Sequence, residues 1–201
     1  MILTFDNVEI SYNDIPVFKG LSFSIGKCTI VQFVGKNGSG KSSILKAIAG
    51  INKPNNGNVL VNGHDFYDYP ISVNYIGHKI AVKPGETVGN NIAFWSALSD
   101  CNLMLDAAVG YFGLGDVIDE KCEDLSEGWN KKVALARLLA VHSDIWVLDE
   151  PEVHLDEESK ARLLHAIEVR AGEGGIVFIA SHNDLKLKNA ITVNLGDFKN
   201  A

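Results

Sequence analysis

The residues with the most specific chemistry form one glycine-rich segment that fits the pattern GxxxxGK[ST], namely Gly35-Lys36-Asn37-Gly38-Ser39-Gly40-Lys41-Ser42. Glycines let main-chain N–H groups converge on phosphate oxygens, and a helix that follows adds the positive end of its dipole. In this pattern we expect Lys41 to reach the β- and γ-phosphates of a nucleotide and Ser42 to bind Mg²⁺. An apolar run precedes the segment and helical spacing follows it, so we predict a phosphate-binding loop rather than an ordinary glycine-serine turn.

Two adjacent carboxylates, Asp149 and Glu150, end the apolar run at residues 145–148. We expect Asp149 to hold Mg²⁺ through its water shell, and Glu150 to orient and deprotonate an attacking water. Acids at the end of a strand are common by themselves. Together with an upstream phosphate loop they predict ATP hydrolysis, with ATP and Mg²⁺ as cofactors.

The elements that must position these residues follow from hydrophobic spacing. Alternating residues predict two half-exposed strands at 2–10 and 17–25, and apolar runs predict strands at 28–34, 73–76, 145–148, 176–180 and 190–195. Helical spacing occurs at 41–49, 130–140 and 157–171, and it replaces all strand signals from 81 to 123. We therefore predict an α/β fold: a parallel core with an N-terminal antiparallel β part and an inserted helical subdomain. Residues 1–201 form one domain, with 1–79 and 130–201 as the nucleotide-binding core and 80–129 as the helical subdomain.

Composition narrows the class of function. Of the 201 residues, 46% are hydrophobic and 21% are charged, as in soluble globular proteins. The net charge of −7 gives no electrostatic attraction to nucleic acid, so we expect none as a partner. The uncharged stretch at 87–99 is too short and too polar to cross a hydrocarbon core about 30 Å thick. The N-terminus lacks the pattern of a signal peptide, so we expect the protein in the cytosol.

Further motifs extend the nucleotide-binding pattern along the chain. An amphipathic helical pattern follows the segment Leu125-Ser126-Glu127-Gly128-Trp129. With this segment, the chain resembles the ATP-binding cassettes of ABC transporters, whose signature is LSGGQ. Asp156 in PEVHLD is similar to the aspartate of the family's D-loop. His182 after GIVFIAS is similar to its switch histidine, and Tyr12 lies where an aromatic ring stacks on adenine.

The resemblance implies a RecA-like P-loop NTPase fold and a head-to-tail homodimer that closes on ATP. Each nucleotide would lie between the phosphate loop of one subunit and the signature of the other, where Ser126 and Gly128 donate to its γ-phosphate. His182 would bridge the γ-phosphate and the facing subunit. The implied nucleotide contacts are Tyr12, Gly35, Asn37, Gly38, Ser39, Gly40, Lys41, Ser42, Ser43, Ser126, Gly128 and Asp156.

A narrower match surrounds His78 in Tyr75-Ile76-Gly77-His78-Lys79. Most cassettes carry glutamine there, which touches Mg²⁺ and the attacking water while its loop contacts the membrane partner. The pattern with histidine resembles the ATPase subunits of haem exporters in cytochrome c maturation. The resemblance implies an energy-coupling ATPase at the cytoplasmic face of the inner membrane, held peripherally by integral membrane subunits. In that branch other subunits handle haem, so we expect no direct haem binding by this chain.

Glu127 departs from the family, because it replaces the first glycine of the signature pair. At about 6 Å from a γ-phosphate and an effective dielectric of about 20, its carboxylate would be repelled by roughly 3 kcal/mol per unit charge. The side chain could point away from the nucleotide, or Lys131 and Lys132 one turn later could offset its charge. Trp129, in place of glutamine, is interpreted as an aromatic packing residue at the interface between the two subunits.

Two other functions remain open from the sequence. A soluble P-loop phosphotransferase would need an arginine-rich lid, and the three arginines, Arg137, Arg162 and Arg170, all lie in predicted helices. A regulatory cassette that binds ATP but barely hydrolyses it would explain the altered signature. The length excludes a cassette of the type that carries long coiled coils.

Overall fold

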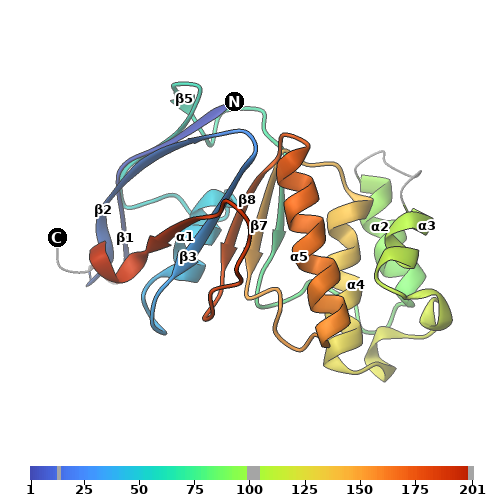
Figure 1. The fold of residues 1–201 in the computed structure, drawn as a ribbon. Helices are drawn as coiled ribbons and strands as arrows, with labels where there is room; N and C mark the ends of the chain where they lie inside the picture. The colour runs from blue at the N-terminus through green and yellow to red at the C-terminus, as the bar shows by residue number, and fades with distance from the viewer. Residues whose placement is uncertain (13–14, 99–104, 199–201) are drawn as a thin grey trace.

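The N-terminal part of the chain is an antiparallel sheet, as predicted. The computed structural model describes residues 1–12, 15–98 and 105–198, and Figure 1 shows this sheet on one side of a parallel sheet, with most of the helices on the other side. The strand order of the antiparallel sheet is β2-β1-β4-β5, and its strands are β1 (Ile2–Tyr12), β2 (Ile15–Gly26), β4 (Asn56–Val61) and β5 (His64–Asp65).

The parallel sheet brings distant chemical motifs to one edge. Its order is β6-β7-β8-β3-β9, with β3 (Thr29–Val34), β6 (Val73–Ile76), β7 (Ile145–Asp149), β8 (Ile176–Ala180) and β9 (Ile191–Asn194). In register, Ala180 of β8 lies between Phe33 of β3 and Asp149 of β7. The segments that follow these three strands, which contain Gly35, Glu150 and His182, therefore start side by side at the carboxyl edge. Ligands of open α/β sheets bind at that edge.

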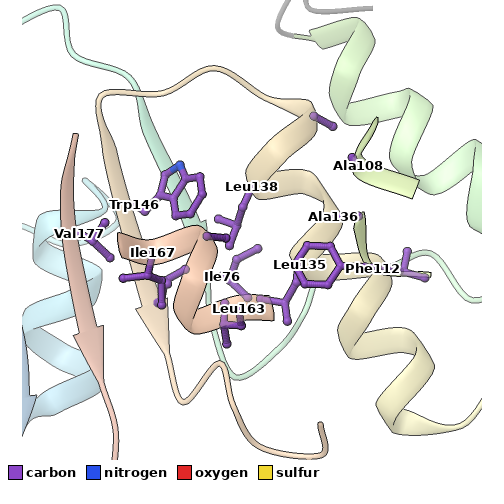
Figure 2. Packing of buried hydrophobic residues seen from close by; sticks show 14 of the residues in the cluster. Ile76, Ala108, Phe112, Leu135, Ala136, Leu138, Trp146, Leu163, Ile167 and Val177 are labelled. Carbon is purple, nitrogen blue, oxygen red and sulfur yellow. The ribbon is translucent and has the colours of Figure 1, made fainter. Parts of the chain in front are cut away.

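Both faces of the parallel sheet are buried, which explains the continuous apolar runs in the sequence. Successive side chains of a strand point to opposite faces. Val147 accordingly belongs to a core shared with the antiparallel sheet and with α1 (Lys41–Ile48), whereas Trp146 and Leu148 belong to a second core. The second core lies under α4 (Glu127–Ala140) and α5 (Glu157–Gly172). Figure 2 shows Leu135 and Leu138 of α4 and Leu163 and Ile167 of α5 gathered around Ile76 and Trp146.

The helical insertion contains α2 (Val88–Leu98) and α3 (Leu105–Tyr111), and both pack against α4. Short 3-10 turns at Gly115–Val117 and Cys122–Asp124 connect α3 to α4, and another, Leu195–Phe198, follows β9. The predicted fold class is confirmed. The helix predicted at 130–140 begins three residues earlier, at Glu127. The division at residue 129 stays a prediction, and α4, which spans it, packs against both inserted helices and against β6.

None of the helices in the described ranges 1–12, 15–98 and 105–198 is long and apolar enough to cross a bilayer.

Candidate nucleotide-binding and catalytic site

The phosphate-binding loop follows β3 and runs directly into α1. Gly40 precedes the helix with φ 98°, and a Cβ atom there would come within 2.7 Å of the Val17 side chain. Only glycine fits both the conformation and the space. Lys41, the first helical residue, is 7% exposed, and its ammonium donates to the Gly35 carbonyl oxygen at 2.8 Å. The loop therefore holds its cation at the amino end of the helix, where phosphate oxygens bind.

A hollow of about 680 Å³ lies over this loop, lined in part by Gly35, Lys36, Ser39 and His182, and we call it the phosphate hollow. Ser39 is 2% exposed, and its hydroxyl has no hydrogen-bond partner among the described residues. Such a hydroxyl is ready to bond a polar ligand. The remaining predicted contacts of the loop are placed around it: Asn37 and Gly38 are exposed at its tip, and Ser42 and Ser43 are in the first turn of α1.

Asp149 ends β7 and is 3% exposed. Burial raises the pKa of its carboxyl and so does the nearby Glu150, while a hydrogen bond with Ser42 and the charges of His78 and Lys131 act in the opposite direction. The structure thus joins the two predicted metal ligands, a serine hydroxyl and a carboxylate. Oxygen donors of this kind fit Mg²⁺.

Glu150 directly follows β7 in a conformation that is unusual for a side chain other than glycine, with φ 49°. Its main-chain N–H donates to the Ala180 carbonyl at 2.9 Å, which ties it to β8. One carboxylate oxygen lies 2.8 Å from Nε2 of His182. Glu150 and His182, which the sequence places in separate motifs, therefore lie in direct contact, carboxylate to imidazole.

His78 is exposed and lines a hollow of about 460 Å³ together with Glu150 and Lys131, which we call the catalytic hollow. The predicted catalytic residues Lys41, His78, Glu150 and His182 thus all lie in segments at the carboxyl edge of the parallel sheet. Polar residues from several strand ends converge there, and the order of these residues in the sequence does not show this convergence.

The signature segment forms the start of α4. Ser126 is its N-cap, and its hydroxyl accepts from the Trp129 N–H at 3.4 Å. Glycine is required at 128, because a Cβ there would lie 2.8 Å from the His154 carbonyl oxygen. A hollow of about 240 Å³, which we call the signature hollow, is lined by Ser126, Gly128, Trp129, Lys132, His154 and Asp156.

Glu127 lines the catalytic hollow and is not among the residues of the signature hollow. Its carboxylate lies 2.7 Å from Nδ1 of His154 in the same chain. His154 lines both hollows, whereas Glu127 lines only the catalytic hollow, which favours the first sequence alternative; that the acid points away from the nucleotide stays a prediction. The lysines contact other groups: Lys131 donates to the Glu150 carbonyl at 3.0 Å, and Lys132 lies 2.9 Å from Asp156.

Asp156 is the N-cap of α5, and its side chain accepts from the Ser159 N–H at 2.7 Å. Hydrogen bonds with Ser159 and Lys132 hold the pKa of this carboxyl well below its usual range. The expected nucleotide-linked role of Asp156 stays a prediction, and the structure adds a local role as a helix cap. The interface role of Trp129 stays a prediction; within the chain its half-buried ring packs on the second core, with the Lys132 ammonium 4.6 Å from its centre.

The structure brings the phosphate loop, Asp149, Glu150 and His182 together, but it places Ser126 and Gly128 in a separate hollow. Tyr12 is the last residue of β1, and its side chain lies outside the described part, so adenine stacking stays a prediction. Sequence reasoning missed His154 and Gln32. Gln32 is 1% exposed in β3 and donates to the Asn183 carbonyl at 2.7 Å, beside His182. An amide within an apolar strand was the available signal.

Comparison with known proteins decides the family. Residues 18–153 match the family model described as ABC transporter. The chain belongs to the ABC transporter family. It is also 39% identical to the cytochrome c biogenesis ATP-binding export protein CcmA of Rickettsia bellii, over 96% of this chain and 100% of that protein. This similarity confirms the branch that the sequence resembled.

Solved structures agree with the cassette fold. An ABC transporter ATP-binding protein from Pyrococcus furiosus superposes with a TM-score of 0.86 at 28% identity, covering 98% of this chain and 99% of that one. A dimeric ATP-binding cassette bound to ADP and phosphate gives a TM-score of 0.81 at 20% identity, over 96% and 93% of the two chains, and supports the fold alone. This cassette is thus an ATP-binding subunit of an ABC transporter, with ATPase activity as its chemistry.

Proposed function

We propose that this cassette hydrolyses MgATP to drive an export complex of cytochrome c maturation, as a head-to-tail homodimer attached to the cytoplasmic face of the inner membrane. One observation carries the catalytic part of the proposal. Asp149, Glu150 and His182 meet at the sheet edge that also presents the phosphate loop, with 2.8 Å between the Glu150 carboxylate and His182. The name and the nearly full-length similarity of the Rickettsia protein support the biological role.

The chemistry divides among the residues of this edge. Lys41 and the N–H groups at the start of α1 bind the phosphates, and Ser39 adds a hydroxyl. Ser42 and Asp149 would hold Mg²⁺, which would neutralise charge on the phosphate oxygens. Glu150 accepts the proton of the attacking water, and His182 orients the carboxylate that does so.

The separation of two hollows in one chain supports the dimer. Ser126 and Gly128 present the amino end of α4, where unpaired N–H groups favour an anion. They line the signature hollow, which shares no lining residue with the phosphate hollow. A second copy in head-to-tail orientation would bring this helix end to the γ-phosphate of its partner's nucleotide.

A binding measurement tests the nucleotide site. Lys41→Ala should abolish ATP binding in calorimetry, since it removes the cation of the phosphate loop. Lys46→Ala, in the last turn of the same helix, removes an equal charge away from the loop and should bind like the parent. Equal affinity of Lys41→Ala and the parent would contradict the assignment of this loop.

The membrane partner is tested through the exposed loop at His78. A photo-crosslinking amino acid in place of the neighbouring Lys79, which is also exposed, should form crosslinks to an integral membrane protein in intact membranes. The same probe at Lys27, on the exposed turn before β3, is the matched control and should not. Crosslinks from Lys79 only to soluble proteins would contradict the membrane-coupled role.

The structure gives no support to a phosphotransferase. Arg137 is buried and donates to Asn74 at 3.1 Å, and Arg162 donates to the Tyr111 carbonyl at 2.6 Å. Arg170 donates to the Ser143 carbonyl. All three arginines thus stabilise the fold, so none is available for a mobile lid over the phosphate loop.

A further inference from the structure

Lys131 occupies an unusual place for a lysine, in the second turn of α4 and under the catalytic carboxylates. It is 7% exposed, and its ammonium donates to the main-chain carbonyl oxygen of Glu150 at 3.0 Å. Burying an ammonium is costly unless hydrogen bonds compensate the loss of water. A lysine at this site therefore serves an interaction that a hydrophobic side chain would not provide.

The charges around Lys131 explain how the ammonium is retained. Burial lowers its pKa, while the carboxylates of Glu152, Asp149 and Glu150 act in the opposite direction. The Lys131 ammonium nevertheless donates its hydrogen bond to the main-chain carbonyl of Glu150 and not to the Glu150 carboxylate. That carboxylate lies 2.8 Å from His182. The lysine thus fixes the backbone of Glu150 while its carboxylate stays directed to the histidine.

Glu150 needs such support, because its φ of 49° is sparsely populated for residues other than glycine. Unfavourable backbone conformations persist where surrounding contacts over-determine them. The N–H of Glu150 is bonded to Ala180 in β8, and its carbonyl is bonded to Lys131 in α4. The sheet therefore holds the peptide unit that precedes the Glu150 Cα, and the signature helix holds the peptide unit that follows it.

We propose that Lys131 is a positioning residue for ATP hydrolysis, which fixes the Glu150 backbone so that its carboxylate meets the attacking water. This inference rests on the proposed role of Glu150 as the base. Lys131 lies on the helix that begins at the signature residue Ser126. In the proposed dimer, the signature of a subunit contacts the nucleotide of its partner, whereas Glu150 serves the nucleotide of its own subunit. The Lys131 side chain thus links the signature helix for one nucleotide to the base for the other.

Three variants test this role in the full chain: Lys131→Met, Lys131→Gln and, as a matched control on the neighbouring helix, Lys160→Met. Lys131→Met should lower kcat by about tenfold or more, since displacing a reacting group by about 1 Å can cost two orders of magnitude. Its Kd and KM for ATP should stay within twofold of the parent, because the phosphate loop is intact. The amide of Lys131→Gln can donate to the same carbonyl and should recover part of kcat.

Thermal unfolding with and without MgATP, measured for each variant, shows whether the folded cassette still binds nucleotide. Parent-like kcat in Lys131→Met would overturn the positioning role and leave the ATPase assignment intact. Loss of kcat together with loss of ATP binding, without recovery in Lys131→Gln, would also overturn it by showing a general structural role. Absence of hydrolysis in the parent chain, alone and in its membrane complex, would contradict the proposed function and this inference with it.

Discussion

At the scale of single residues, the direction of the Glu127 carboxylate in the signature is explained by its contact with His154, two residues before the N-cap of α5. The Glu127 carboxylate lies 2.7 Å from His154, although both side chains are largely exposed, at 81% and 53%. Exposed pairs of this kind contribute only about 0.2–1 kcal/mol. A contact of this strength biases the direction of the carboxylate by no more than about fivefold, and a substitution of His154 removes that bias.

His154→Gln should weaken ATP-dependent dimerisation several-fold, because it frees the Glu127 carboxylate near the face that Ser126 and Gly128 present. The double variant His154→Gln with Glu127→Gln should regain the affinity of the parent. Glu127→Gln alone should change the affinity by less than threefold, since the charge is already turned away. Sedimentation with MgATP at two salt concentrations measures these effects, and salt should reduce the loss.

Two results would count against this account of the signature. If Glu127→Gln and Glu127→Gly both tighten the parent dimer strongly, the carboxylate faces the nucleotide in the dimer. If the double variant stays as weak as His154→Gln, the histidine acts through the backbone near Gly128 rather than through the acid.

At the scale of elements, α4 joins the signature, the second core and, through Lys131, the proposed base Glu150. Leu135 in its middle is fully buried, and Figure 2 shows it beside Phe112. Leu135→Ala should lower the free energy of unfolding by about 2–5 kcal/mol, the usual range for a buried leucine. Leu98→Ala removes the same atoms from an exposed position of α2 and should change it by less than about 0.5 kcal/mol. Urea unfolding distinguishes the two, and equal effects would contradict the role of α4 as a core helix.

At the amino ends of β6 and β7, opposite the candidate site, Ser72 and Asp144 form a contact whose strength depends on pH. Burial acts to raise the pKa of Asp144, but hydrogen bonds with Ser72, at 3.0 and 2.7 Å, outweigh it and lower that pKa. The stabilisation is therefore fully present above the unfolded-state pKa of about 3.9 and is lost as the pH falls through the lower folded-state pKa. Asp144→Asn should unfold at lower urea than the parent at neutral pH, and the difference should shrink in acid. A difference that grows in acid would reverse the assigned sign.

The sequence predicted those elements whose signals are local. Apolar runs identified β3 and β7, and the phosphate loop was readable because its glycines, Lys41 and Ser42 are contiguous. The start of α4 was placed three residues too late, because the helical spacing begins only at residue 130, whereas the first turn contains Gly128, which the close approach of the His154 carbonyl requires. Tertiary packing creates the contacts of Lys131 with Glu150 and of Glu127 with His154, and no local pattern encodes either.

At the scale of the whole molecule, the fold separates two faces that ATP joins in the proposed dimer. The phosphate hollow lies at the carboxyl edge of the parallel sheet, and the signature hollow lies at the amino end of α4. Neither face contains all predicted phosphate contacts. Closure of two copies around ATP would complete both sites at once, and hydrolysis would release them, which is how chemistry at Glu150 could move a membrane partner.

Sedimentation and phosphate release of Glu150→Gln with MgATP test this central claim most directly. The amide keeps the size of the side chain but cannot take the proton of water. We predict that this variant binds ATP with the affinity of the parent, loses nearly all hydrolysis and accumulates as an ATP-bound dimer. Adding Lys41→Ala should return it to a monomer. Hydrolysis at the rate of the parent, or a variant that stays monomeric with ATP bound, would contradict the account.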